Sequence, residues 1–163
     1  MKLTQYTDLS LRLLMYLAMH QHKTVTIQEI SVRFAVSKNH MVKISHQLTK
    51  SGLIESTRGR NGGVRMVRNP DTINIEQVIL VTEENFDLVE CFSESNSCVI
   101  TDVCKLNGFL DKALEAFLKE LRQVSLADLV KGKKEIEKAL HPFPQVSIVR
   151  FGPRSRKNTL TKS

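Results

Sequence analysis

The feature that most limits what this chain can fold into is a helix pattern followed at once by a glycine-rich hairpin. Residues 37–51 have helical periodicity, with Ser37 at the N-cap and Gly52 in place to end the helix. Residues 53–57 and 64–67 then read as two short strands, and the Asn-Gly-Gly between them permits the positive φ values of a tight turn. A hairpin in this position is a wing, so the stretch predicts part of a winged helix-turn-helix.

Two helix patterns before this unit supply the rest of the helix-turn-helix. The first follows Thr7, which we expect to be its N-cap. Its apolar residues recur at helical spacing: Leu11, Leu14, Met15 and Ala18. Thr26 is placed to cap a second, shorter helix. The fold class we predict is therefore mainly α-helical with a small β wing.

The third helix pattern has an apolar side and a polar, basic side. The apolar stripe is Met41, Ile44 and Leu48, and the opposite side carries Asn39, Lys43, His46 and Lys50. A solvated face usually mixes charge signs, whereas a face without acids is typical of a helix that enters the major groove of DNA. Arginines and an asparagine in the hairpin loop suit phosphates and the minor groove. We therefore predict the following DNA contacts: Ser37, Lys38, Asn39, His40, Lys43, Arg58, Arg60 and Asn61.

Charge is divided unevenly along the 163 residues. Residues 1–68 hold 11 Lys and Arg against 3 Asp and Glu, a net charge of +8. Residues 69–141 hold 8 against 14, and residues 142–163 hold 5 against none. A basic N-terminal half fits contact with a polyanion, although charge alone does not separate DNA from RNA or anionic lipid.

A third region of interest is the helix pattern of residues 107–122, the most regular in the chain. Its apolar stripe is Leu110, Ala113, Leu114, Phe117, Leu118 and Leu121. One small winged domain cannot cover so broad a stripe, so we predict a homodimer in which a second copy covers it. Ser125 is placed to cap a further short helix. The basic, proline-containing tail from His141 onward is predicted to be disordered.

The chain has three cysteines, and all of them lie just before this long helix pattern. They are Cys91, Cys98 and Cys104. An odd number of thiols cannot all pair as disulfides, so a soft-metal or iron–sulfur site is the natural alternative. Three unrelated buried or surface cysteines are the other interpretation.

Several protein classes are disfavoured by what the sequence lacks. No uncharged apolar run approaches the roughly 20 residues of a membrane helix. The first residues lack the apolar stretch of a secretory signal, so we expect a cytoplasmic protein with no membrane partner. No HExxH motif, paired-carboxylate site or nucleotide-binding loop indicates an enzyme.

Four segments together resemble a known family. They are residues 36–44, residues 58–64, the three spaced cysteines and residues 125–130. These resemble the NsrR-type, nitric-oxide-sensitive repressors, part of the winged-helix family that also contains the iron–sulfur cluster regulator IscR. The resemblance covers about residues 1–135. It implies a homodimeric repressor that binds an inverted-repeat operator in double-stranded DNA. When nitric oxide is present, such a repressor leaves the operator, and nitrosative-stress defence genes are expressed.

The resemblance also implies a cofactor, an iron–sulfur cluster held by the three cysteines. The chain does not fix whether the cluster is [2Fe–2S] or [4Fe–4S]. The IscR type adds a histidine shortly after its third cysteine, but this chain has Asn107 there and no histidine before His141. In the NsrR type, an aspartate of the N-terminal helix of the other subunit completes the ligation, and Asp8 matches that position. An acid favoured by the helix dipole is the alternative role of Asp8. Arg12, one turn further on, is placed to pair with Asp8 when the cluster is lost.

These expectations divide the chain into four parts. They are a winged helix-turn-helix domain (residues 1–80), a cluster-binding loop (81–106), a dimerisation helix and C-terminal helix (107–140), and a basic tail (141–163). An iron- or redox-sensing regulator of the same family, and a repressor that senses through its thiols without a cluster, remain open as alternatives.

Overall fold

The computed structural model describes residues 2–59, 62–93 and 95–140. Along the chain the elements are α1 (Gln5–Met19), α2 (Ile27–Arg33), α3 (Lys38–Lys50), β1 (Ile54–Thr57), β2 (Gly63–Met66), α4 (Ile75–Thr82), α5 (Leu106–Arg122), α6 (Leu126–Leu129) and α7 (Lys133–Leu140). The predicted fold class is confirmed: the fold is mainly helical, with a two-stranded antiparallel wing. The predicted basic tail, residues 141–163, lies outside the described residues.

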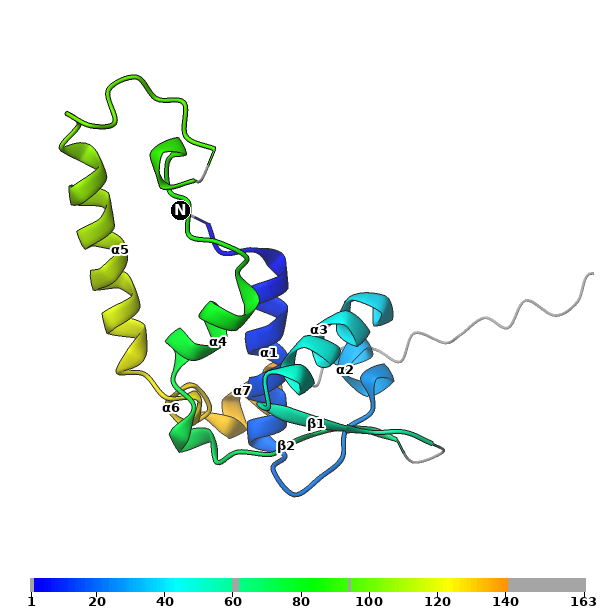
Figure 1. The fold of residues 1–163 in the computed structure, drawn as a ribbon. Coiled ribbons are helices and arrows are strands. Elements are labelled where there is room, and N and C mark those ends of the chain that lie inside the picture. Colours follow the sequence, from blue (N-terminus) through cyan, green and yellow to red (C-terminus); the bar gives the residue numbers. More distant parts are fainter. Residues whose placement is uncertain (1, 60–61, 94, 141–163) are drawn as a thin grey trace, which may run out of the picture.

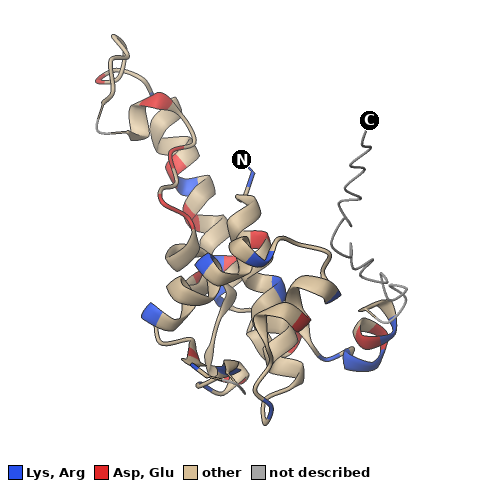
Figure 2. Cartoon of the chain, turned by 90° about the vertical axis from the view of Figure 1, so that its right-hand side faces the viewer, with Lys and Arg blue, Asp and Glu red and all other residues tan. Residues whose placement is uncertain are grey.

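Figure 1 shows a body formed by α1 to α4 and the wing, with α5 standing at its side. The long segment between α4 and α5 lies at the far end of α5 from the body, in both Figure 1 and Figure 2. The chain returns to the body through α6 and α7. The predicted domain boundary at residue 80 falls within α4.

The helix α1 is the centre of the core and is covered on most of its sides. Its buried apolar residues are Leu9, Leu13, Leu14, Tyr16, Leu17, Ala18 and Met19. The predicted stripe is therefore right for Leu14 and Ala18 but too narrow, since it omitted the other buried residues. It also included Leu11 and Met15, which are only partly buried. The prediction of Thr7 as N-cap is wrong: the cap is Thr4, whose side chain accepts a hydrogen bond from the Thr7 amide at 3.2 Å.

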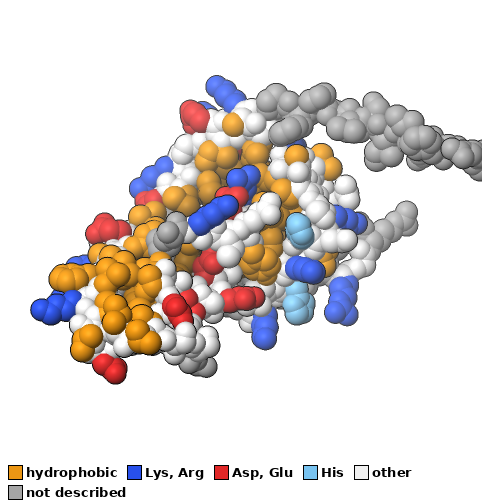
Figure 3. Space-filling model, turned by 90° about the horizontal axis from the view of Figure 1, so that it is seen from above, with side chains coloured by type: hydrophobic (Ala, Val, Ile, Leu, Met, Phe, Trp, Pro, Cys, Tyr) orange, Lys and Arg blue, Asp and Glu red, His pale blue; other side chains and the backbone are white. Residues whose placement is uncertain are grey.

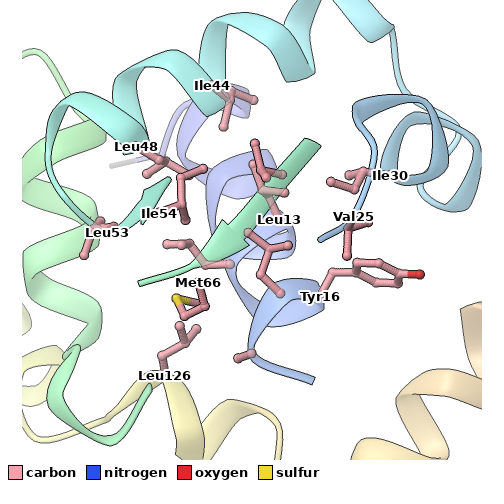
Figure 4. Close-up of a cluster of buried hydrophobic side chains, with 14 of the residues drawn as sticks. Leu13, Tyr16, Val25, Ile30, Ile44, Leu48, Leu53, Ile54, Met66 and Leu126 are labelled. Atoms are coloured by element: carbon pink, nitrogen blue, oxygen red, sulfur yellow. The ribbon is translucent and has the colours of Figure 1, made fainter. Parts of the chain in front are cut away.

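The other helices of the body pack their apolar sides onto α1. Figure 4 shows side chains converging from α1, α3, both strands and α6. The labelled members are Leu13, Tyr16, Val25, Ile30, Ile44, Leu48, Leu53, Ile54, Met66 and Leu126. Thr26 caps α2 as predicted, by accepting a hydrogen bond from the Glu29 amide.

The wing is a two-stranded ribbon that is fastened to the body. Ile54 pairs with Met66 at one end of the ribbon, and Thr57 pairs with Gly63 at the other. Val25, in the loop before α2, exchanges two backbone hydrogen bonds with Val64, of 2.9 and 2.8 Å. This close approach requires glycine beside it, since a Cβ on Gly63 would lie 2.4 Å from the Val25 carbonyl oxygen.

The helices α4 and α5 are joined by an ion pair that the sequence patterns did not predict. Asn74 caps α4, which packs against α1 and α5. Glu76 is buried and accepts two hydrogen bonds from the Arg122 guanidinium, both of 2.6 Å. These bonds lower the pKa of the Glu76 carboxyl below its usual range. A bidentate pair of this kind fixes the C-terminal end of α5 on α4.

The last two helices return to the core. Ser125 caps α6 as predicted, in a capping box with Asp128, and Leu126 is fully buried. The Leu126 amide donates to the Ile73 carbonyl oxygen at 2.8 Å, which ties α6 to the segment before α4. The Lys133 ammonium donates to the carbonyl oxygen of Met19 in the last turn of α1. The helix dipole favours a positive charge at this end of a helix.

Candidate DNA-binding face and cysteine loop

The outward side of α3 carries the residues predicted to read DNA. The predicted apolar stripe of Met41, Ile44 and Leu48 is fully buried and fixes the helix on the core. The predicted polar side is exposed throughout: Asn39, Lys43, His46 and Lys50. Figure 3 shows histidine side chains close to those of lysine or arginine, on a part of the surface away from α5. The exposed side of α3 is thus basic and open to a polyanion.

The start of α3 is exposed as well. Ser37 occupies the N-cap position of α3, and its side chain makes no capping hydrogen bond. Ser37, Lys38 and His40 are all exposed. In helix-turn-helix proteins the first residues of this helix contact base edges and phosphates, so these side chains stand where such contacts are made.

Sequence reasoning missed one residue of this face, Val42. Its side chain is 49% exposed, while every other apolar residue of α3 is fully buried. Val42 lies one helical turn from Asn39 and from His46, among the polar side chains. An apolar side chain there can contact the methyl group of thymine. The sequence did contain a signal for this residue: Val42 is apolar but lies outside the apolar stripe, on the helix side that carries Asn39 and His46.

The wing contributes one described residue to the predicted DNA contacts. Arg58 follows β1 and is exposed. Arg60 and Asn61 lie outside the described residues. A third arginine, Arg65, forms an ion pair with Glu55 directly across the ribbon, so its charge is already partnered.

The three cysteines all lie in one segment, residues 84–105, which joins α4 to α5 and is called here the cysteine loop. Cys91 is in a short 3-10 turn and is half-buried, as is Cys104, whereas Cys98 is exposed. All three are free thiols. In the part of the chain that the structure describes, no group of three or more His, Cys, Asp or Glu side chains lies close enough to hold a metal ion. The cysteines are therefore on one loop but are not drawn together.

The middle of the cysteine loop is shaped by polar side chains. The Ser97 hydroxyl and amide both donate to one carboxylate oxygen of Glu90, at 2.6 and 3.2 Å. These bonds lower the pKa of Glu90. The Asn96 amide group donates to the Thr101 hydroxyl at 2.9 Å. Local turns of this kind hold the loop without an apolar core.

Asp8 lies in the first turn of α1. It forms an ion pair with Arg12, with 2.8 Å between Oδ2 and the guanidinium, and both side chains are about half exposed. Asp8 lines an open cavity together with Lys2, Leu3, Thr4 and Gln5. Its carboxylate is thus on the surface and accessible from outside the protomer.

Comparison with known proteins decides the family. Residues 3–132 match the model of the Rrf2 family, which is described as an iron-dependent transcriptional regulator. The chain belongs to the Rrf2 family. It is therefore a DNA-binding transcriptional regulator and not an enzyme.

Within the Rrf2 family, the chain is similar to regulators named NsrR. The HTH-type transcriptional regulator NsrR of Shouchella clausii is 44% identical over 142 residues, which cover 86% of this chain and 95% of that protein. NsrR of Bacillus subtilis is also 44% identical over 142 residues, with 86% and 97% covered.

Solved structures share the Rrf2 fold. IscR of T. potens superposes with a TM-score of 0.66 at 23% identity, covering 84% of this chain and 91% of its own. CymR, the global cysteine regulator of B. subtilis, gives 0.64 at 22% identity, covering 79% and 95%.

The long helix of this Rrf2 regulator presents an apolar face that one protomer leaves open. No residue of α5 is fully buried, and Phe109 is 67% exposed. On the adjoining cysteine loop, Val99 and Val103 are 97% and 79% exposed. Figure 3 shows a hydrophobic patch at the α5 end of the molecule. Figure 2 shows acidic and basic positions interspersed along the same projecting part, unlike the exposed side of α3, which carries no acid. None of the described helices is long and apolar enough to cross a membrane.

The donor chemistry of the cysteine loop fits an iron–sulfur cluster. Thiolates are the ligands that such clusters take from proteins, and the loop supplies three free thiols within residues 91–104. The thiols are separated in the described conformation, so the loop would have to close for all three to hold one cluster.

Proposed function

We propose that this Rrf2 regulator is a cytoplasmic, homodimeric repressor of the NsrR type, which senses nitric oxide through an iron–sulfur cluster and releases nitrosative-stress defence genes. The observation that supports this most is the cysteine loop itself. In a chain 44% identical to NsrR regulators, all three cysteines are free and lie on the one loop that leads from the body to the long helix α5.

In this proposal Cys91, Cys98 and Cys104 hold the cluster, and Asp8 of the partner subunit completes the ligation. A bound cluster supplies a centre that reacts with nitric oxide. Thiolates held at one point close the cysteine loop, and released thiols allow it to open. Asp8 then exchanges its ligand role for the ion pair with Arg12 seen in the described chain.

The exposed apolar face of α5 supports the dimer. Its stripe contains Leu110, Leu114, Phe117, Leu118 and Leu121, all of them only half-buried in one protomer. A two-fold interface would cover the same stripe on both copies, since such interfaces are self-complementary. Dimerisation places two α3 helices and two wings on one duplex, which fits an inverted-repeat operator.

The signal must change operator affinity through a difference between two states. A ~100-fold change in affinity corresponds to a coupling free energy of roughly 2.7 kcal/mol. A few hydrogen bonds gained or lost between the cysteine loop and the body are of the required size.

The decisive experiment combines cluster analysis with DNA binding. Protein purified without oxygen is analysed for iron and sulfide and by absorption spectroscopy, and an operator is selected from random-sequence DNA. We expect nitric oxide to bleach the cluster absorption and to weaken operator binding over the same range of added nitric oxide. Unchanged operator affinity after complete bleaching would defeat the nitric-oxide proposal and favour an iron- or redox-sensing regulator.

One observation favours a second candidate, a repressor that senses through its thiols without a cluster. In the described chain the three cysteines are free and separated, and Cys98 is exposed to reagents. This candidate predicts full operator binding by iron-free protein and loss of binding after thiol oxidation. The NsrR-type proposal predicts weak operator binding by the iron-free protein.

A further inference from the structure

Glu83 stands at the point where the cysteine loop leaves the body. It is the C-cap residue of α4, and residues 84–105 follow it. We infer that Glu83 is a positioning residue that couples the cysteine loop to the DNA-binding helix α3 through the first turn of α1. This inference rests on the proposed function for the signal, but its contacts are those of the described chain.

One oxygen of Glu83, Oε1, accepts three hydrogen bonds from the start of α1. The Thr4 amide donates at 2.8 Å, the Thr4 hydroxyl at 3.1 Å and the Thr7 hydroxyl at 2.5 Å. Thr7 is fully buried, and its hydroxyl also lies 2.9 Å from that of Thr82. A carboxylate is favoured at this end of a helix by the macrodipole. Glu83 therefore holds the root of the cysteine loop on the same turn that carries Asp8.

We call the hydrogen bonds of Glu83 to Thr4 and Thr7 the Glu83 latch. The helix α3 is hydrogen-bonded to both helices that this latch joins, α1 and α4. The Tyr6 hydroxyl, in the first turn of α1, donates to the Lys43 carbonyl oxygen at 3.3 Å. From α3, the Gln47 side chain donates to the carbonyl oxygen of Val81 near the end of α4, also at 3.3 Å. Both α3 residues lie in the same helix as the exposed face that meets DNA. A shift of either α1 or α4 at this junction is therefore transmitted to α3.

The junction lies at the edge of the packed core and is open to solvent on one side. A cavity of about 690 Å³ opens between the three helices, and its lining includes Thr4, Tyr6, Gln47, Val81 and Glu83. Close packing normally fixes the distance between helices. At this edge of the core the polar links add to the apolar packing, and the strongest of them ends on the carboxylate of Glu83.

The consequence is a defined route for the signal. A closed cysteine loop keeps Glu83 against α1, so α1, α4 and α3 stay in register. When the loop opens and pulls on its root, the Glu83 bonds are the first that it meets. The start of α1 then loses its bonds to Glu83, and the positions of Tyr6 and Val81, which bond to α3, can shift relative to each other.

The test compares operator affinity with and without the cluster in Glu83→Ala, Glu83→Gln and the control Glu84→Ala. Glu84 is the adjacent exposed acid. If the unchanged protein shows a ~100-fold difference, we expect Glu83→Ala to reduce it below about 10-fold, mainly by weakening the cluster-bound form. Glu83→Gln should keep part of the difference because its amide oxygen still accepts hydrogen bonds. Glu84→Ala should keep all of it.

A second variant and a second readout keep the result clear. Thr7→Val removes one buried hydroxyl at nearly constant volume, and it should also reduce the difference. Amide hydrogen exchange should become faster in α3 around Lys43 and Gln47 in Glu83→Ala but not in Glu84→Ala. A full affinity difference in Glu83→Ala, or unchanged exchange in α3, would overturn the latch. If the unchanged protein shows no difference with the cluster removed, the proposed function fails, and the exchange measurement alone decides the role of Glu83.

Discussion

At the scale of single residues, the side chains of α3 divide into buried ones that hold the helix on the core and exposed ones on the side that we propose faces DNA. Met41, Ile44 and Leu48 belong to the first group and are fully buried. Asn39 and Val42 belong to the second, one polar and one apolar, on neighbouring parts of the exposed side. Base edges offer both hydrogen-bonding groups and thymine methyl groups, so the two residues suit different features of a base pair.

Replacing Asn39 by Ala is therefore expected to lower affinity for the selected operator by about 1–3 kcal/mol and to have little effect on random DNA. Val42→Ala should weaken binding to an operator that has a thymine opposite Val42. It should have no effect on the same operator with uracil at that position, because uracil lacks the methyl group. Binding to operators with single thymine-to-uracil changes measures this. In contrast, Arg58→Ala should weaken both DNAs and reduce the slope of the salt dependence by about one unit. Equal losses on operator and random DNA for Asn39→Ala would exclude base reading by Asn39.

The cysteines give a second prediction at this scale. Cys98→Ala should abolish iron and sulfide incorporation while leaving the thermal stability of the iron-free protein unchanged, because the Cys98 side chain is exposed and outside the core. Ser95→Ala, in the same loop and also exposed, is the matched control. Iron and sulfide analysis together with thermal unfolding checks both variants. A full complement of iron and sulfide in Cys98→Ala would remove Cys98 from the ligand set.

At the scale of elements, α5 is attached to the body at its C-terminal end. The buried Glu76 carboxylate and Arg122 make that attachment. The N-terminal end of α5 carries the cysteine loop, away from the body. The helix thus has one fixed end and one end that depends on the loop.

The Glu76–Arg122 pair predicts an acid-sensitive attachment. Because the bonds from Arg122 lower the pKa of Glu76 in the folded protein, the pair contributes its full stability above the usual glutamate pKa. That contribution is lost as the pH falls through the lowered pKa and Glu76 becomes protonated. Melting temperatures measured between pH 7 and pH 3 should therefore fall less steeply in Glu76→Gln than in the unchanged protein. Glu120→Gln, a change at an exposed glutamate of α5, is the control and should keep the pH dependence of the unchanged protein. An equal pH dependence of the melting temperature in Glu76→Gln and in the unchanged protein would contradict this role.

Element patterns in the sequence were informative where one side of a helix faces water. The predicted helix 107–122 agrees with α5, which starts one residue earlier, since its polar and apolar sides are distinct. The helix α4 was not recognised. Its sequence, IEQVILVT, is short and buried on most sides, so it lacks the 3.6-residue alternation that identifies a helix. The start of α1 was misplaced for a related reason: Thr4 and Thr7 are equally good caps in isolation, and burial of Thr7 decides between them.

The candidate site was predictable only in its residue types. The α3 face follows from local helical spacing, so its exposed side chains were identified correctly. The link from Glu83 to Thr4 and Thr7 spans more than 75 residues, and no local pattern reveals such a contact. The proposed gathering of the three cysteines involves a second copy and a cofactor, which no pattern within one chain can reveal.

At the scale of the whole molecule, the chain consists of a winged unit and the helix α5, through which we propose that two copies join. The winged unit has a continuous core around α1, whereas α5 has no buried residue of its own. The winged unit is therefore expected to keep its fold when the dimer is broken.

Leu114→Asp tests this division, since Leu114 is at the centre of the α5 stripe and is half-buried. A charge there cannot be covered by a partner helix without a large penalty. We expect a monomer by light scattering, with native melting of the winged unit and at least ~10-fold weaker binding to the inverted repeat, because only one half-site is held at a time. Glu115→Ala, on the same helix, should remain dimeric. A dimeric Leu114→Asp protein would mean that another surface joins the subunits.

The fastening of the wing at Val25 and Val64 has a consequence for the genes that this protein controls. A wing held by two backbone bonds cannot swing to follow a displaced groove. One extra base pair between the two half-sites rotates one of them by roughly 35° relative to the other. In the proposed dimer, most of such a mismatch therefore falls on the interface between the two copies. Target promoters should share a single spacer length, and a genome search that fixes this length will separate true operators from chance half-sites.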